Sequence, residues 1–208
     1  MPYRLKQLLE ALACEKAPGP SAAFSVFHIS RAIELNAKKP IGRNLLAHNL
    51  NTGEGVARTI ISRLRDAGLI TVSKAGCVLT KKGLSVMNNY QQTIKKVEFG
   101  KSELTNNEWN WAILVKNQGY KLKSGMEQRD AAVKNGAADA TTMVFKKRHL
   151  VIPSISNDAM RDFPQAAKQI MRSFKLEEND VVIIAGASDS GIAERGALAA
   201  AWTLLDDN

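Results

Sequence analysis

The sequence has few of the residues that build redox and metal centres. Its 208 residues include 2 cysteines and 3 histidines. Cys14 and Cys77 match neither a metal-site nor a disulfide-framework spacing, so we interpret them as reduced thiols. The histidines form no local metal-ligand spacing and no element of a catalytic triad. We therefore expect no metal, no cofactor and no enzymatic activity.

Long apolar runs are also missing. No stretch approaches the ~18 apolar residues that cross a bilayer. The opening segment, MPYRLKQLLEALACEKAPG, is amphipathic and lacks the continuous apolar stretch of a signal peptide. With 45% hydrophobic residues, the chain can still build one large or two small domains. We expect a soluble cytoplasmic protein with no membrane partner.

The positive charge is confined to one half of the chain. Residues 1–98 contain 15 Lys+Arg and 6 Asp+Glu, whereas residues 99–208 contain 14 of each kind. A basic half beside a neutral half indicates one module that meets a polyanion and one that does not. The alternative is that the excess cations only keep the protein soluble. A polar stretch around Gly100 predicts a linker at 99–106, which separates domains at 1–98 and 107–208.

Residues 53–67 predict a two-faced helix that ends at Gly68. Before it, PIGRNLLAHNL predicts a short helix, and the polar stretch NTGEG predicts a tight turn between the two. After it, LITVSKAGCVLT predicts a β-hairpin that turns at residues 74–76. The segment SAAFSVFHISRAIELNA predicts a central helix of the same domain. The order is helix, helix, turn, helix, hairpin, which is that of a winged helix-turn-helix.

This order, with RLRDAGLI leading into the hairpin and LTKKG closing it, resembles the winged-helix domains of prokaryotic transcriptional regulators over about residues 20–84. The resemblance implies that the helix at 53–67 enters the DNA major groove. Arginine can bond a guanine edge or clamp a phosphate. We expect Arg43 and Lys74 to contact phosphates. The full set of expected DNA contacts is Arg43, Thr52, Arg58, Thr59, Ser62, Arg63, Arg65 and Lys74.

Three other interpretations of this domain stay open. The polar helix face could be merely solvated, with Glu54 and Arg58 as a stabilising pair. Some winged helices dock proteins instead of DNA. The basic half could also touch structured RNA in the translation apparatus, with contacts from the hairpin and to phosphates, because the major groove of duplex RNA is too narrow for a helix.

Two further apolar stripes at helical spacing flank this domain. They consist of Leu5, Leu8, Leu9 and Leu12, and of Val86, Met87, Tyr90, Ile94 and Val97. Each stripe predicts either packing onto the parent domain or a dimer interface.

The second half predicts the element order β-α-β-β-α-β-α, with a hairpin turn at residues 146–148. That order favours a two-layer α/β sandwich such as the ferredoxin-like fold with an extra terminal helix, so the chain as a whole is α+β. The strand VVIIAGA and the helix GALAAAWTLL supply apolar surface for a homodimer.

A small-residue turn, IIAGASDSGIAERG, joins a strand to a helix in the second half. Helix-start N–H groups can hold an anion, which makes Gly186, Ser188, Asp189, Ser190 and Gly191 candidate ligand contacts. The turn lacks the lysine of a P-loop and the first Gly-x-Gly of a dinucleotide fingerprint. A plain strand-to-helix turn is therefore the simpler interpretation, and an enzyme built on it lacks a nucleophile, a base or a metal set.

As a whole, the chain resembles a little-characterised family of archaeal proteins. The likeness rests on PIGRNLLAHNLNTGEGVARTIISRLRDAGLI, GMEQRDAAVKNGAADATT and DVVIIAGASDSGIAERGALAAAW. It implies an N-terminal winged helix and a C-terminal domain like the GAD domain of bacterial aspartyl-tRNA synthetases, whose topology begins with two strands. It brings no assigned substrate.

The sequence therefore predicts a transcriptional regulator that binds double-stranded DNA. Its second domain is expected to form a homodimer, to sense a small-molecule effector, or to do both. The alternative is an RNA-binding protein associated with translation.

Overall fold

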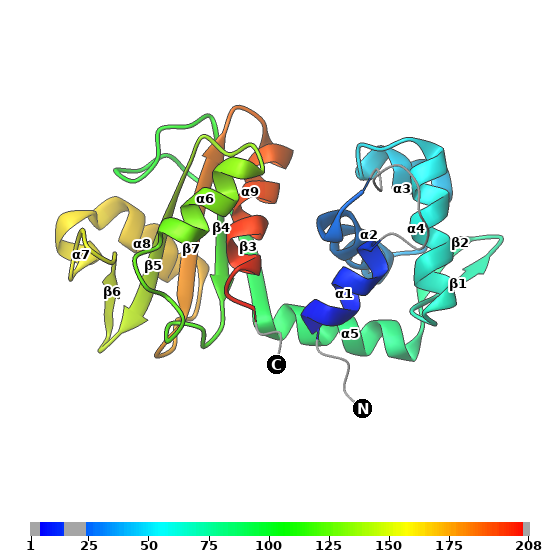
Figure 1. Cartoon of the computed structure of the whole chain (residues 1–208), viewed down its shortest axis with the longest axis horizontal. Coiled ribbons are helices and arrows are strands. Elements are labelled where there is room, and N and C mark those ends of the chain that lie inside the picture. The colour runs from blue at the N-terminus through cyan, green and yellow to red at the C-terminus, as the bar shows by residue number, and fades with distance from the viewer. Residues whose placement is uncertain (1–4, 15–23, 206–208) are drawn as a thin grey trace. The chain divides into compact units, whose positions relative to one another are not determined.

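The computed structural model describes residues 5–14 and 24–205 (Figure 1). The chain forms two units. The first ends at Gln91, and the second runs from Gln92 to Leu205. Each unit has buried apolar side chains of its own, as expected of separately folded domains.

The first unit is mostly helical and carries one hairpin. Its elements are α1 (Leu5–Ala13), α2 (Val26–Lys38), α3 (Arg43–Asn49), α4 (Glu54–Asp66), β1 (Ile70–Ser73), β2 (Gly76–Leu79) and α5 (Lys81–Thr93), which runs past Gln91. α3 packs on α4, and the side chains of Leu46, Ile60 and Leu64 are fully buried. This is the predicted order of two helices, a turn, a helix and a hairpin.

Only one of the two flanking apolar stripes forms a single helix. Leu8, Leu9 and Leu12 are buried, and α1 packs on α2, so the first stripe serves packing within the unit. The second stripe is not one helix. α5 ends at Thr93, and Ile94 begins the next strand.

The hairpin is tied to the chain that precedes α3. Ile41 and Cys77 exchange two backbone hydrogen bonds, with N···O distances of 3.1 and 2.9 Å. Gly76, the first residue of β2, has φ +118°, and a Cβ there would lie 2.7 Å from the carbonyl carbon of Ile41. Only glycine fits this close approach, so the hairpin has a defined position beside α4.

The second unit is a sheet with helices. Its elements are β3 (Ile94–Phe99), β4 (Trp109–Val115), α6 (Met126–Lys134), β5 (Asp139–Lys146), β6 (His149–Val151), α7 (Ala159–Asp162), α8 (Pro164–Ser173), β7 (Val181–Ala187) and α9 (Ser190–Trp202). The strand order is β3-β4-β7-β5-β6, and every neighbouring pair is antiparallel.

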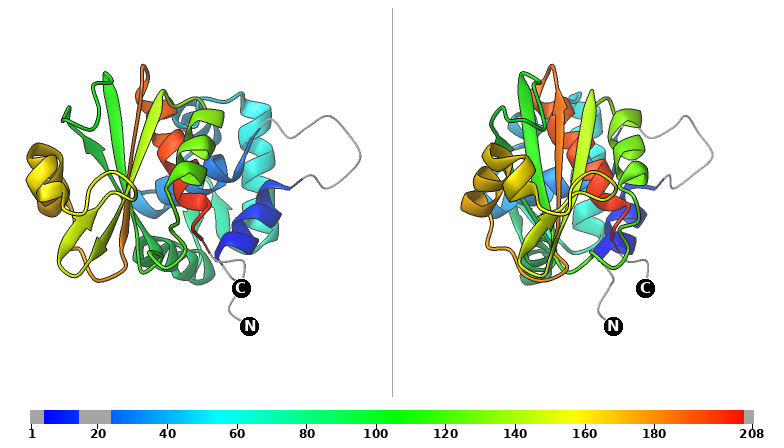
Figure 2. Two further views of the ribbon diagram at one scale, coloured as in Figure 1. Left: turned by 60° about the vertical axis from the view of Figure 1, so that its left-hand side comes forward. Right: turned by 90° about the vertical axis from the view of Figure 1, so that its left-hand side faces the viewer.

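Both faces of this sheet are covered. Val182 and Ile184 share a buried cluster with Ile170 of α8, whereas α9 packs on β4 and β7, and α6 packs on β5. The right-hand view of Figure 2 shows helices on the two sides of the strands. All seven residues of β7 are buried. A strand that is apolar on both faces needs cover on both faces.

The predicted α+β class is confirmed, but the second unit differs from the expected sandwich in its layers and strand order. A ferredoxin-like sheet has its helices on one face, whereas here α8 adds a layer on the face opposite α6 and α9. The sheet also gains β3, so two strands precede α6, as the GAD-like resemblance implied. The GAD likeness itself stays a prediction.

The predicted linker at 99–106 is wrong. Phe99 pairs with Asn110 in the sheet, and the N–H of Gly100 donates to Oε1 of Gln169 at 3.2 Å. Glu103 accepts backbone hydrogen bonds from the first turn of α8, from Gln165 at 2.8 Å and from Ala166 at 3.0 Å. The boundary lies earlier, after Gln91, because Ile94 and Val97 also suit a strand.

Glu103 is held as a carboxylate by this arrangement. Desolvation alone would raise its pKa, but the two backbone N–H groups of α8 outweigh it, and the pKa of Glu103 lies below its ordinary value.

No helix within residues 5–14 and 24–205 combines the length and the apolar character needed to cross a membrane.

Candidate nucleic-acid interface

α4 separates an apolar face from a polar one. Ala57, Ile60 and Leu64 are fully buried against the first unit, whereas Arg58, Thr59 and Arg65 are exposed. We call these three residues the exposed face of α4. The spacing that buries one set necessarily turns the other toward solvent, so the helical-wheel prediction holds at these positions.

Arg58 is the most available cation on this face. It makes no hydrogen bond or ion pair with any residue that the structure describes. The neighbouring hydroxyl of Thr59 donates to the carbonyl of Gly55 at 3.1 Å and keeps its lone pairs free to accept. The guanidinium can therefore take a planar acceptor, such as a guanine edge or a phosphate, without breaking a contact in the protein.

Arg65 lies in a local network with its own helix. Its Nη2 donates to Oγ of Ser62 and to Oδ1 of Asp66, each at 3.3 Å, and Oγ of Ser62 donates to Oδ2 of Asp66 at 3.3 Å. Arg65 is 58% exposed and Asp66 48%, so this ion pair is weak and can open. Asp66 nevertheless reduces the positive charge at this end of α4.

Arg63 was also predicted to contact DNA, but its side chain has partners inside the unit. Its Nη1 donates to the carbonyls of Leu12 at 2.8 Å and of Cys14 at 2.6 Å. Its guanidinium carbon lies 4.8 Å from the centre of the Phe24 ring, a cation–π contact. Arg63 therefore satisfies the carbonyls at the end of α1 and joins α1 to α4.

Thr52, another predicted DNA contact, lies partly buried in the turn between the two helices. Its N–H donates to the carbonyl of Ala47 at 3.0 Å in the turn between α3 and α4. Its hydroxyl oxygen is buried and has no partner among the residues described. The side chain is therefore unavailable to an external ligand, although the turn it supports was predicted.

Arg43 and Lys74 are the two other cations predicted to contact phosphates. Arg43, at the start of α3, pairs with Glu54, at the start of α4, at 3.3 Å. The two side chains are 43% and 52% exposed, so the pair is weak and Arg43 can exchange it for another anion. Lys74 lies in the exposed turn of the hairpin, which is closed by a hydrogen bond from Oγ of Ser73 to the carbonyl of Gly76 at 3.1 Å.

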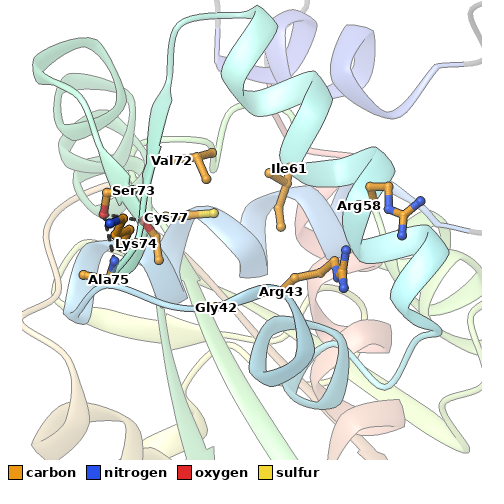
Figure 3. A pocket seen from close by; sticks show the side chains of 10 residues that line it. Gly42, Arg43, Arg58, Ile61, Val72, Ser73, Lys74, Ala75 and Cys77 are labelled. Carbon is orange, nitrogen blue, oxygen red and sulfur yellow. Dashed lines mark hydrogen bonds between the residues drawn. The ribbon is translucent and has the colours of Figure 1, made fainter.

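A hollow of about 360 Å³ opens between α4 and the hairpin (Figure 3). Its lining consists of Gly42, Arg43, Arg58, Ile61, Val72, Ser73, Lys74, Ala75, Gly76 and Cys77. Arg43 and Arg58 lie on one side and Lys74 on the other, with Ile61, Val72 and Cys77 between them (Figure 3). Burial raises the pKa of the Cys77 thiol, so this part of the hollow is uncharged.

Sequence reasoning missed this hollow. Ile61 follows the apolar spacing of the helix, and that spacing predicts packing within the unit for it. Val72 is 54% exposed, an unusual position for an apolar β-branched residue between cations. The signal was the alternation in ITVS, which places Val72 on the same face of the strand as Ile70, although Ile70 is buried and Val72 is exposed.

The candidate ligand turn in the second unit is filled by its own side chains. Oδ1 of Asp189 accepts from the N–H of Ile192 at 2.9 Å and so caps α9. Oγ of Ser190 accepts from Nε1 of Trp111 at 3.1 Å. A Cβ on Gly186 would lie 2.5 Å from the amide atoms of Asn107 and Asn110.

These contacts oppose the anion-binding interpretation of this turn, which stays a prediction. A carboxylate already occupies the helix start, where it satisfies an N–H group and repels a second anion. Ser188 and Gly191 are exposed, but residues 186–191 contain no lysine or arginine that could attract an anion. The plain strand-to-helix turn, the simpler of the two interpretations, fits these contacts.

Within the described ranges, no group of three or more His, Cys, Asp or Glu side chains is arranged to hold a metal ion.

A polar cluster lies where β4 ends and β7 begins. Nζ of Lys116 donates to the buried carboxylate of Asp180 at 2.8 Å and to Glu177 at 2.9 Å. Burial alone would lower the pKa of Lys116, but these two acceptors outweigh it and raise the pKa.

Two family models match the chain, one in each part. Residues 25–94 match the model described as the CggR N-terminal DNA binding domain. Residues 106–204 match a domain of unknown function, DUF4443. No curated protein matches the chain.

Among solved structures, the chain is similar to a hypothetical protein from Pyrococcus horikoshii OT3. The TM-score is 0.69 at 28% sequence identity, over 87% of this chain and 92% of that chain. BusR of S. agalactiae, in complex with its promotor DNA, is aligned over 98% of both chains but at a TM-score of 0.23 and 12% identity. The first similarity shows that both units occur together in another protein, whereas the second is too weak to support an argument.

Proposed function

We propose that this protein is a DNA-binding transcriptional regulator that inserts α4 into the major groove. The observation that carries the proposal is the exposed guanidinium of Arg58, which has no partner among residues 5–14 and 24–205, beside a hollow whose charged residues are all cations. The match of residues 25–94 to a DNA-binding domain supports it. The concentration of positive charge in residues 1–98 supports it independently.

The division of contacts follows from geometry and chemistry. The major groove of B-form DNA admits an α-helix, and the N-terminal part of such a helix meets the base edges. Arg58 and Thr59 lie toward that end of α4 and are the base-contacting residues of the proposal. Arg43 and Lys74 neutralise phosphates on either side, and Arg65, freed from Asp66, adds a third backbone contact.

The second unit is assigned no chemistry. The segments that the sequence suggested for a dimer surface, β7 and α9, are fully and largely buried in the single chain. A homodimer is still part of the proposal, because regulators that read two half-sites need two copies of the reading helix. A small-molecule effector, a cytoplasmic location and the absence of catalysis also stay proposals.

The test begins with the full-length protein and a random pool of DNA duplexes. Selection should enrich a preferred site, and binding to it should weaken with salt, with a log–log slope of about −0.9 for each phosphate neutralised. Arg58→Ala should weaken that site by about 1–3 kcal/mol and relax base choice at one position. Arg172→Ala, which removes an exposed arginine of α8, is the matched control. It should change neither the affinity for the selected site nor the base choice.

Two results would oppose this proposal. One is unchanged affinity and base choice in Arg58→Ala. The other is crosslinking in cells that recovers RNA and no DNA, which would favour the RNA-binding alternative. Duplex RNA would have to bind through the hairpin and phosphates, because its major groove does not admit α4.

A further inference from the structure

The hollow between α4 and the hairpin combines two chemistries. Its rim carries three cations, Arg43, Arg58 and Lys74, and none of its lining residues is acidic. Its floor is apolar and consists of Ile61, Val72 and Cys77 (Figure 3). A site for a free anion needs cations or N–H groups around one point. Here an uncharged gap separates the cations instead.

One strand of a nucleic acid has the same alternation. Charged phosphates alternate with sugars, whose carbon atoms are much less polar. The strand that separates the major from the minor groove has to pass between a helix in the major groove and a hairpin beside it. The hollow lies at that place, between α4 and β1–β2.

The floor distinguishes between the two kinds of sugar. Val72 is 54% exposed, and water meets its side chain in the free protein. Covering it with the carbon face of a deoxyribose removes apolar surface from water on both sides. The hydroxyl of Ser73, which also lines the hollow, already donates to the carbonyl of Gly76 and accepts from the N–H of Ala75. A ribose would bring a 2′-hydroxyl to a floor of hydrocarbon and one neutral thiol, where it would lose water without gaining a strong hydrogen-bond partner.

The floor is also held in place. The two backbone hydrogen bonds between Ile41 and Cys77, and the close approach at Gly76, fix the hairpin against the chain before α3. The fully buried Ile60 fixes the neighbouring turn of α4. The gap between Ile61 and Val72 is therefore part of the folded unit and need not form on binding.

Resting on the proposed function, we propose that this hollow holds one sugar–phosphate strand of duplex DNA, with a single deoxyribose over Ile61, Val72 and Cys77. Phosphates on either side of that sugar meet Arg43 at one edge and Lys74 at the other, while Arg58 stays directed at the base edges. The hollow thereby selects deoxyribose over ribose at one nucleotide of the site. This selection is independent of groove width.

The experiment uses the full-length protein and a duplex enriched by selection. Each position of each strand is replaced in turn by a single ribonucleotide, which leaves the duplex largely B-form, and in a second series by a neutral methylphosphonate. At one nucleotide, both the ribonucleotide and the methylphosphonate should weaken binding. The ribonucleotide should weaken binding about tenfold there, as expected for a hydroxyl buried without a partner.

Val72→Thr supplies the missing hydrogen-bond partner at nearly constant shape. It should reduce the ribonucleotide penalty at that position to about twofold or less, because the threonine hydroxyl can pair with the 2′-hydroxyl. Val78→Thr, on the adjacent strand of the same hairpin but outside the hollow, is the matched control and should leave the penalty at its full value.

The outcomes separate this inference from the proposed function. DNA binding with no ribonucleotide-sensitive position would overturn the inference alone. A penalty that Val72→Thr leaves unchanged would do the same, as would a ribonucleotide that strengthens binding. Failure of the protein to bind any duplex DNA would overturn both proposals together.

Discussion

The two parts of the chain contain almost equal numbers of cations but use them differently. Residues 1–98 contain 15 Lys+Arg and residues 99–208 contain 14; with the boundary after Gln91, the numbers are 13 and 16. In the second unit, Lys116 is bound to Asp180 and Glu177, and Arg161 to Asp162. In the first unit, Arg58 and Lys74 have no partner among the residues described. Unpaired charge, more than net charge, marks the surface that can meet a polyanion.

Removing the buried carboxylate of the second unit should give the largest effect. Asp180 is 1% exposed and accepts from Nζ of Lys116 and from the N–H groups of Asn117 and Glu177. Asp180→Ala should lower the free energy of unfolding of this unit by about 3–5 kcal/mol, because it leaves the N–H groups of Asn117 and Glu177 without their acceptor and leaves Lys116 with only its exposed partner Glu177. All 3 tryptophans lie in the second unit, so their fluorescence in urea measures this loss directly.

DNA affinity below the melting transition should be unchanged in Asp180→Ala. A loss of affinity in the folded variant would break the comparison, since it would make the second unit part of the binding surface. Glu177→Gln is the control, because it removes the exposed partner of Lys116 and should have little effect on stability.

Arg63 should affect folding of the first unit more than DNA binding. Arg63→Ala removes two hydrogen bonds to carbonyls at the end of α1 and should destabilise the unit by about 1–3 kcal/mol. Labelling of the buried thiol Cys77 by an alkylating reagent, followed by mass spectrometry, should become faster. Arg63→Lys should recover part of the lost stability. In both variants the log–log slope of DNA affinity against salt concentration should stay the same. A slope reduced by about one would mean that Arg63 contacts a phosphate.

Changes at the two edges of the hollow should shift affinity in opposite directions. Lys74→Ala should weaken all DNA sequences alike and reduce the salt slope by about 0.9. Glu54→Gln should strengthen binding by up to about fivefold, because it frees Arg43 from a weak exposed pair. Lys134→Ala, on α6 in the second unit, is the control and should alter neither property. Weaker binding in Glu54→Gln would show that the pair positions Arg43.

The smallest effect should come from Glu103, which accepts hydrogen bonds from the first turn of α8, and this effect should depend on pH. The pKa of Glu103 is lowered, so its stabilising contribution is present above the pKa of the unfolded chain and is lost as the pH falls through the folded value. Glu103→Gln should lower the melting temperature of the second unit slightly at neutral pH. The difference from wild type, followed by tryptophan fluorescence, should vanish in acid. A difference that persists there would assign the effect to packing.

Local patterns were sufficient for most elements of the first unit. The spacing of Ala57, Ile60 and Leu64 defined the faces of α4, and Gly68, with φ +71°, ends the helix region as predicted. The turn at Lys147 and Arg148 was also correct. Both residues have positive φ, the pattern of a two-residue hairpin turn.

Long-range contacts account for what the sequence patterns missed. Ile94 and Val97 fit a helical stripe as well as a strand, and only pairing with β4 decided between them. The helix start at residues 189–191 looked open to an anion because no local rule shows that Asp189 caps it. Arg63 looked like its neighbours on the helix, yet its partners lie in α1, far away in the sequence.

The sequence by itself determined the faces of α4, the position of the hairpin and the uneven distribution of charge, because these depend on spacing within a few turns and on composition. The tertiary structure decided which cations are free. It withdrew Arg63 into the unit, left Arg58 exposed and set Ile61 of α4 opposite Val72 of the hairpin. A side chain is available to a ligand only when no residue brought near it by folding has already satisfied it, and that depends on contacts between segments far apart in the chain.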